Sequence, residues 1–186
     1  WIRTSGSIWA WEVASGNVTE ALVELVGPQS PEAEGIRARG EAYRARIEAL
    51  DAWTRARLAT IPEGQRVLIT SHDAFNYFGR AYDIDVLGIQ GVSTEQEASQ
   101  RDVANSIEQV RQRKAPAIFV ESSVNPALIK QVGRETGAEV AGPLYSDSTG
   151  PADGQAASFT GMFAENIRQI TEALGGEYAP FQGPGE

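Results

Sequence analysis

Two stretches with apolar residues at helical spacing open the chain. In positions 8–26 apolar residues recur at roughly helical intervals with one Ser-Gly interruption, which predicts a helix. A short run of glycine and proline then breaks the pattern. Ser30 followed by Pro31 has the form of a helix start, because proline suits the first helical position. From Pro31 to Ile61 the apolar residues keep mostly three-, four- or seven-residue spacing, so we expect a second, long amphipathic helix.

The pattern changes after residue 62, where short apolar runs begin to alternate with helical segments. We expect strands at 66–70, 85–89, 117–120 and 138–141, and helices at 74–82, 99–113, 126–136 and 158–174. Strands that alternate with helices in this way are typical of parallel sheets. The chain is therefore predicted to have an α/β fold, with a four-stranded, mostly parallel sheet, helices on both faces, and the long helix in front of it.

The same pattern divides the chain into four parts. These are an N-terminal helical segment (1–30), the long helix (31–62), an α/β lobe (63–176) and a C-terminal tail (177–186). Glycine and proline are frequent in and just before the tail, and such termini are often poorly ordered. We expect the tail to be flexible and loosely held.

Composition and charge exclude several classes of function. The 186 residues are 41% hydrophobic and 22% charged, which is typical of a globular chain with a substantial core. The net charge of -9 argues against a nucleic-acid partner, because binding to phosphates requires a cationic surface. The chain has no cysteine and a single histidine, His72. Disulfides, thiolate sites and any site with two imidazoles from this chain are therefore excluded.

Polar residues follow each predicted strand, and the carboxyl ends of parallel strands meet at one edge of a sheet. These polar runs are Ser71-His72-Asp73, 91–95, Glu121-Ser122-Ser123 and 144–148. One imidazole with several carboxylates suits a divalent cation such as Mn²⁺ or Zn²⁺. A lone histidine after a strand is also commonly a loop residue or a cap, so both interpretations stay open at this point.

The sequence gives less support to a catalytic function. Ser71, His72 and Asp73 are consecutive, and neighbouring side chains of an extended segment point to opposite sides, so they cannot form a nucleophile–base relay. The chain has no G-x-S-x-G elbow and no glycine-rich phosphate-binding motif. A serine hydrolase and a nucleotide-binding enzyme are therefore disfavoured.

Several segments resemble the metal-binding solute receptors of ABC importers, the cluster A-I or TroA-like family. The matching text includes RVLITSHDAF from residue 66, AIFVESSVNP from 117, GPLYSDSTG from 142 and SFTGMFAENIRQITEALGG from 158. The long helix resembles the rigid interdomain helix of that family. The resemblance implies that this chain is the C-terminal part of such a receptor, including that helix.

The resemblance also implies roles for individual residues. His72 falls on the family's third metal ligand and Asp147 on the fourth, while Glu121 matches a glutamate that supports the site rather than binding the ion. Ser7 stands where the family has the histidine of its D-P-H-x-W motif, although Trp9 matches. The first ligand would belong to an N-terminal lobe that precedes this chain. We therefore expect an incomplete, weak metal site.

The implied function is an extracytoplasmic solute-binding component for Mn²⁺ or Zn²⁺, with no catalytic cycle. Its partners would be the metal ion and an importer permease, and it would be periplasmic or anchored outside the membrane. Apolar surface normally covered by the other lobe would favour self-association. Two alternatives are a metal-free interaction module with the same fold, and a metal-assisted hydrolase that uses His72, Glu121 and Asp147.

Overall fold

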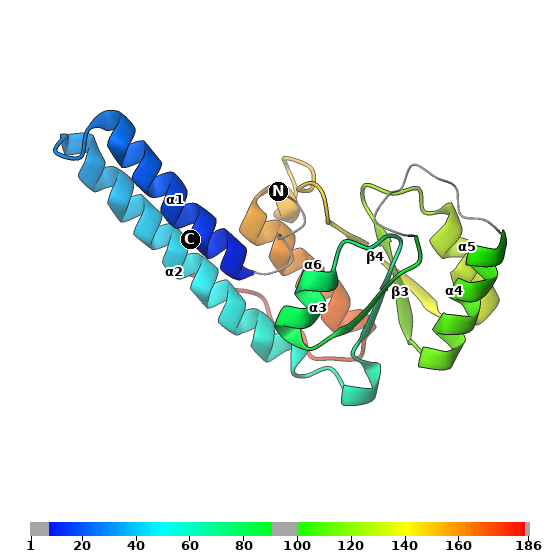
Figure 1. The fold of residues 1–186 in the computed structure, drawn as a ribbon. Coiled ribbons are helices and arrows are strands. Elements are labelled where there is room, and N and C mark those ends of the chain that lie inside the picture. The colour runs from blue at the N-terminus through cyan, green and yellow to red at the C-terminus, as the bar shows by residue number, and fades with distance from the viewer. Residues whose placement is uncertain (1–7, 91–99, 185–186) are drawn as a thin grey trace.

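The computed structural model describes residues 8–90 and 100–184, and its first feature is a pair of antiparallel helices, α1 (Ile8–Val26) and α2 (Pro31–Leu58). The pair projects from an α/β lobe (Figure 1). Ser30 caps α2, because its hydroxyl accepts a hydrogen bond of 3.2 Å from the backbone N–H of Ala33. The helix ends at Leu58, three residues before the end expected from the sequence. Among the described helices, none has the length and hydrophobicity needed to cross a membrane.

The lobe contains the predicted alternation of strands and helices. In chain order it comprises a short 3₁₀ turn (Glu63–Gln65), β1 (Val67–Thr70), α3 (Asn76–Tyr82), β2 (Asp85–Gly88), α4 (Gln100–Arg113), β3 (Ala117–Glu121), α5 (Ala127–Thr136), β4 (Glu139–Leu144), a second 3₁₀ turn (Gln155–Ala157) and α6 (Phe159–Ala173). The four strands lie in the order β2-β1-β3-β4, and every neighbouring pair is parallel. The expected α/β class with a four-stranded sheet is confirmed.

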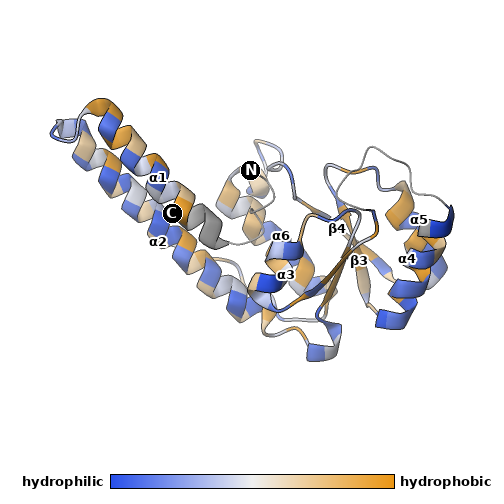
Figure 2. Ribbon diagram, viewed as in Figure 1, coloured by the Kyte–Doolittle hydropathy of each residue, from blue (hydrophilic) through white to orange (hydrophobic). Residues whose placement is uncertain are grey.

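Both faces of the sheet are covered by helices. On one face Leu68 and Phe119 pack in a buried cluster with side chains of α2, α3 and α6. On the other face Ile69 and Ile118 pack with α4 and α5. Successive strand residues point to opposite faces, so each apolar strand contributes to both clusters. Figure 2 shows these hydrophobic strands between helices whose outer sides are largely hydrophilic.

Strand β4 runs further than the sequence indicated. We expected the strand to stop at residue 141, yet Leu144 still pairs with Glu121 across a register shift. Gly142 has a φ of 107°, and a Cβ atom there would lie 2.7 Å from the carbonyl oxygen of Val120. Only glycine adopts this conformation at such a close approach without strain. The extended strand carries the segment after Leu144 to the same edge as the ends of β1 and β3.

The C-terminal tail differs from the expectation of a loosely held segment. The Trp53 indole N–H on α2 donates a hydrogen bond of 2.9 Å to the carbonyl oxygen of Ala179. The Trp53 ring also packs against Tyr178 and Phe181, with ring centroids 6.2 and 5.5 Å apart. Aromatic contacts and a hydrogen bond to the backbone therefore hold the described part of the tail along α2, despite its glycine and proline content.

Candidate metal site

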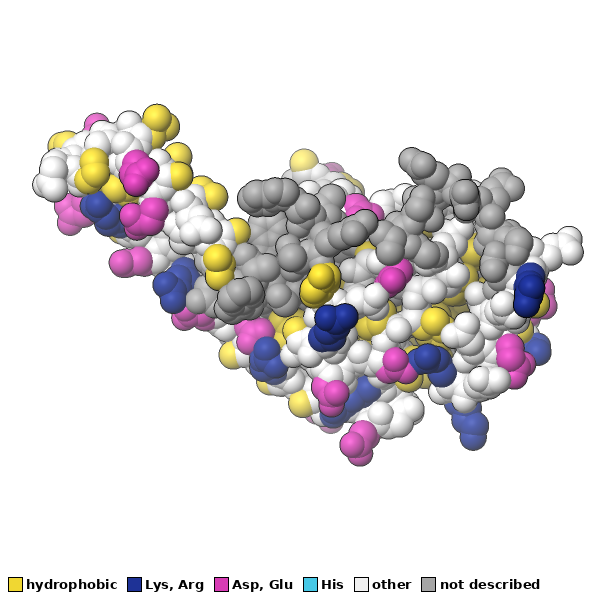
Figure 3. Space-filling model, viewed as in Figure 1, with side chains coloured by type: hydrophobic (Ala, Val, Ile, Leu, Met, Phe, Trp, Pro, Cys, Tyr) yellow, Lys and Arg dark blue, Asp and Glu magenta, His cyan; other side chains and the backbone are white. Residues whose placement is uncertain are grey.

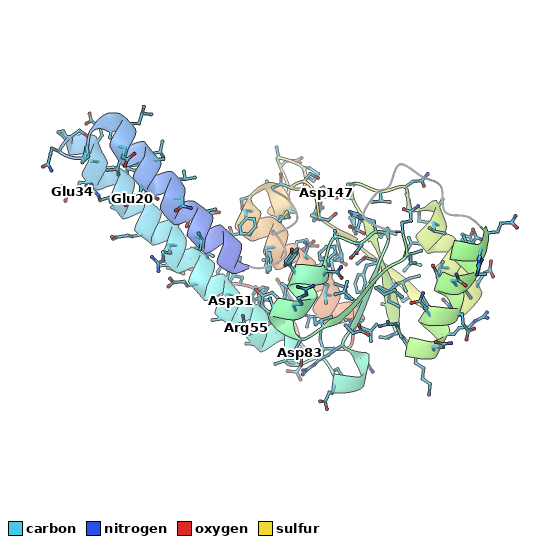
Figure 4. The ribbon with its side chains drawn as sticks, in the orientation of Figure 1. Glu20, Glu34, Asp51, Arg55, Asp83 and Asp147 are labelled. Atoms are coloured by element: carbon cyan, nitrogen blue, oxygen red, sulfur yellow. The ribbon has the colours of Figure 1, made fainter. Side chains whose placement is uncertain are left out.

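The candidate site lies where the order of strands reverses. The chain passes from β1 outward to β2, and then crosses back over β1 to reach β3 on its other side. In open α/β sheets, ligands bind beyond the carboxyl ends of the strands at this kind of switch point. His72 follows β1, Glu121 ends β3, and Asp147 follows β4. Figure 4 labels Asp147 at the upper edge of the lobe and Asp83, which precedes β2, at the lower edge.

Glu121 holds His72 in place. Both residues are buried, with 3% and 6% of their surface exposed. One carboxylate oxygen of Glu121 accepts a hydrogen bond of 2.9 Å from the backbone N–H of His72, and the other lies 2.8 Å from Nδ1 of the imidazole. That second contact is not aligned as a hydrogen bond, and neither atom has another partner within the described residues. The carboxylate beside Nδ1 favours a proton on that nitrogen, which leaves the lone pair of Nε2 for an ion.

The free side of the imidazole faces Asp147. Nε2 of His72 lies 3.6 Å from Oδ2 of Asp147, which is too far for a direct hydrogen bond. Zinc binds nitrogen and oxygen ligands at about 2.0–2.2 Å, so two ligands of one tetrahedral ion are about 3.4 Å apart. The observed separation therefore fits two atoms that share one metal ion. About a third of the Asp147 side chain is exposed, so an ion can reach it.

Two serine hydroxyls hold the Asp147 carboxylate. Ser123 Oγ donates a hydrogen bond of 2.8 Å to Oδ2, and Ser146 Oγ donates one of 3.2 Å to the same oxygen. Ser123 belongs to the segment after β3, whereas Ser146 directly precedes Asp147. The oxygen that faces His72 is therefore fixed from two directions.

Strand β2 supports the loop that carries His72. A Cβ atom on Gly88 would lie 2.7–2.8 Å from backbone atoms of His72 and Asp73. The hydroxyl of Thr70 donates a hydrogen bond of 2.8 Å to the carbonyl oxygen of His72. The glycine lets the loop lie directly against the sheet, and the hydroxyl fixes its turn. This packing places the imidazole at the edge of the sheet.

The structure brings His72, Glu121 and Asp147 together, as the sequence predicted, but their role toward a metal stays a prediction. Ser7 and the polar segment 91–95 lie outside the described residues. Over residues 8–90 and 100–184, no group of three or more His, Cys, Asp or Glu residues has an arrangement that could hold a metal ion. Within that part of the chain, the candidate donors are the His72–Asp147 pair.

Sequence reasoning assigned no role to three residues that shape this site. Ser123 and Ser146 lie in polar runs after strands, which was a usable signal, although nothing in the sequence shows that both donate to Asp147. Asn166 lies inside α6 and makes two hydrogen bonds of 2.8 Å to the backbone of Tyr145, two residues before Asp147. A single asparagine within a helical pattern gives no sign of such a contact.

Comparison with known proteins identifies the family. Residues 7–173 match the family of the periplasmic zinc-uptake complex component A, ZnuA. The chain is 37% identical over 172 residues to the zinc-binding protein TroA of Treponema pallidum, covering 90% of this chain and 54% of that protein. It is 38% identical over 173 residues to the manganese-binding lipoprotein MntA of Bacillus subtilis, covering 90% of this chain and 56% of that protein.

Solved structures agree with this relationship. The periplasmic zinc-binding protein TroA from Treponema pallidum superimposes with a TM-score of 0.85 at 34% sequence identity, over 92% of this chain and 63% of that one. The chain spans about half the length of the curated relatives that it matches. The fold, the matched residues and the sequence identity together show that this chain belongs to the ZnuA family of metal-binding components of uptake systems.

Proposed function

We propose that this chain forms one wall of the metal site in a solute-binding component of an ABC importer, and that the transported ion is Mn²⁺ or Zn²⁺. The observation that carries this proposal is the 3.6 Å separation of His72 Nε2 and Asp147 Oδ2 at the switch point of the sheet. The names of the relatives, a zinc-binding protein and a manganese-binding lipoprotein, agree with this pair of metals.

The chemistry of the two donors suits capture and release. A neutral imidazole and a carboxylate are ligands that both ions accept, and the carboxylate neutralises part of the ionic charge. Glu121 contacts the backbone and the Nδ1 side of His72, so it supports the imidazole while Nε2 binds the ion. Two protein ligands give weak binding, and further donors from outside the described residues would raise the affinity. The relatives are named as binding proteins, which disfavours the hydrolase alternative.

The proposal includes a setting for the chain. As in its family, it would act outside the cytoplasm, in the periplasm or anchored to the outer side of a membrane, and would deliver the ion to a permease. The helix α2 would be the rigid connection between two lobes, with the α/β lobe of residues 63–176 on one side. Exposed apolar side chains on α1 support self-association of the isolated chain.

Metal-dependent stabilisation tests the proposal. The chain is first stripped of metal with EDTA. Its thermal unfolding is then measured without metal and with increasing concentrations of Mn²⁺ or Zn²⁺. An ion that binds the folded state at ten times its Kd adds about 1.4 kcal/mol to the free energy of unfolding and so raises the midpoint. We expect Asp147→Asn to abolish this rise. This variant should fold, because Asp147 is exposed and the amide keeps the carboxylate's shape.

A matched control separates the site from the general acidity of the chain. Glu139 is an exposed carboxylate at the opposite end of β4, so Glu139→Gln removes the same charge far from the site. We expect this variant to respond to metal as the unchanged chain does. If metal stabilises no form of the chain, or stabilises the Asp147→Asn variant equally, the proposed metal site is wrong and the interaction-module alternative gains support.

A further inference from the structure

The end of β3 and the two residues that follow it contact both candidate ligands. Glu121 accepts a hydrogen bond from the backbone of His72, and two residues later Ser123 donates one to Asp147. His72 and Asp147 follow two different strands, β1 and β4, which both pair with β3. Residues 121–123 are therefore the structural link between the two donors.

We propose that Ser123 is a positioning residue that sets the Asp147 carboxylate at the correct distance from His72 for one metal ion. This inference rests on the proposed metal-binding function. Residues 121–123 then act as a spacer in which Glu121 fixes the imidazole and Ser123 fixes the carboxylate. The result of that spacing is the 3.6 Å separation between Nε2 and Oδ2.

Ser123 can do this where Ser146 cannot. Ser146 is adjacent to Asp147, so its hydroxyl moves with the same loop, and it reaches the segment after β3 only through a 3.4 Å contact with the Ser123 hydroxyl. The Ser123 hydroxyl comes from a different strand connection, 24 residues away in sequence, and its hydrogen bond is shorter, at 2.8 Å against 3.2 Å. Among the described residues, the hydrogen bond from Ser123 is therefore the direct connection between the carboxylate and the end of β3, where Glu121 holds His72.

The hydroxyl and the ion can use the carboxylate together. Both serines donate to Oδ2, which has about two lone-pair positions, so an ion bound at Oδ2 would replace the longer hydrogen bond from Ser146 and leave the one from Ser123 in place. The Asp147 side chain is 36% exposed, and without the hydrogen bond from Ser123 it would keep the longer one from Ser146, which does not fix it relative to β3. Hydrogen bonds that orient metal ligands are commonly worth a factor of about 10–100 in metal affinity.

Three variants test the role of Ser123. Ser123→Ala removes the hydroxyl, Ser123→Thr keeps it, and Ser122→Ala removes a hydroxyl from the neighbouring exposed residue. Ser122 makes its hydrogen bond to Leu144 through the backbone N–H, which the substitution leaves in place. The Kd for Mn²⁺ is measured from the electron paramagnetic resonance signal of the free ion, and that for Zn²⁺ by calorimetry. The metal-free unfolding midpoint is recorded for each variant.

We expect Ser123→Ala to weaken binding by about tenfold or more while the metal-free midpoint stays unchanged. The Ser123→Thr and Ser122→Ala variants should both bind metal nearly as tightly as the unchanged chain. Equal affinities for Ser123→Ala and Ser122→Ala would overturn the inference and leave the proposed function standing. So would a threonine variant that binds as poorly as the alanine variant. If the unchanged chain binds neither metal, the proposed function fails and this inference fails with it.

Discussion

Glu165 on α6 lies among hydrogen-bond donors from its own helix. The Arg168 guanidinium contacts both carboxylate oxygens, at 2.9 and 2.5 Å, and the amide of Gln169 donates a hydrogen bond of 3.0 Å. The hydrogen bonds from Arg168 hold the pKa of Glu165 below its usual value, and the one from Gln169 acts in the same direction against the effect of burial. The folded state therefore favours the ionised carboxylate.

This lowered pKa predicts a specific dependence of stability on pH. The contribution of Glu165 is complete above its unfolded pKa of about 4.3 and is lost as the pH falls through the lower folded pKa. We expect Glu165→Gln to reduce the free energy of unfolding by about 1 kcal/mol at neutral pH, since the side chain is partly exposed. The difference should shrink as the pH falls below about 4.3 and through the lower folded pKa. Urea unfolding at several pH values measures it.

Glu172 provides the control, because it pairs with the same Arg168 from one turn further along α6. Its side chain is 48% exposed, so Glu172→Gln should cost less at neutral pH than Glu165→Gln. A Glu165→Gln variant whose stability differs from the unchanged chain by the same amount at every pH would contradict the argument.

At the scale of elements, Asn166 joins α6 to the segment that carries Asp147. Its side-chain oxygen accepts a hydrogen bond from the N–H of Tyr145 and its amide donates one to the carbonyl oxygen of the same residue, each of 2.8 Å. Asn166 is 5% exposed, so water does not readily replace these bonds. The helix thereby fixes the backbone just after β4, two residues before the candidate ligand.

The substitution Asn166→Asp tests this connection with almost no change of shape. A carboxylate cannot donate to the carbonyl oxygen of Tyr145, so this partly buried acceptor loses its donor and faces a second oxygen. We expect a loss of about 1–3 kcal/mol in the free energy of unfolding, measured with urea. Metal affinity should fall as well, because the loop that holds Asp147 loses its attachment.

Asn125 offers the matched substitution. It is exposed, and its side-chain oxygen accepts a hydrogen bond of 3.0 Å from Ala127 at the start of α5, a role that aspartate also fills. Asn125→Asp should therefore leave stability nearly unchanged. If Asn166→Asp and Asn125→Asp reduce the free energy of unfolding equally, the added charge explains the loss and the connection through Asn166 does not.

The alternation of apolar runs and helical segments was sufficient to predict the elements of the lobe. Each strand was placed within one residue at its start, because short apolar runs bounded by polar residues have few alternatives. The end of β4 was missed because Gly142-Pro143 usually ends a strand, and the positive φ that lets it continue depends on the contact with Val120. The packing of the tail was missed for a related reason, since it depends on Trp53, more than 120 residues away.

The candidate site was predictable only in part. The polar residues after β1, β3 and β4 could be assigned to one edge because parallel strands end together. The resemblance to a family then singled out His72 and Asp147. Distances and hydrogen bonds, such as that from Ser123 to Asp147, depend on how far each loop extends beyond its strand. The number of residues in a loop does not determine how far the loop extends beyond its strand.

At the scale of the whole molecule, the helical pair exposes an apolar surface away from the lobe. Val18, Leu22 and Leu25 of α1 are 59%, 44% and 82% exposed, and their spacing places them on one side of the helix. Figure 3 shows apolar side chains along the projecting pair. Exposed apolar patches of this kind favour association. The net charge of -9 opposes it, because copies of the chain repel one another.

These opposing effects predict self-association that depends on salt. Salt screens repulsion between copies but leaves apolar contact largely intact, so dimerisation of the unchanged chain should increase with ionic strength and with protein concentration. Sedimentation velocity at low and high salt measures this.

We expect Leu25→Glu to keep the chain monomeric, since it places a charge in the apolar surface. Asn17→Glu adds the same charge at an exposed polar position of α1 and should associate nearly as the unchanged chain does. A chain that stays monomeric in high salt, or a Leu25→Glu variant that associates as strongly as Asn17→Glu, would show that α1 is not the contact.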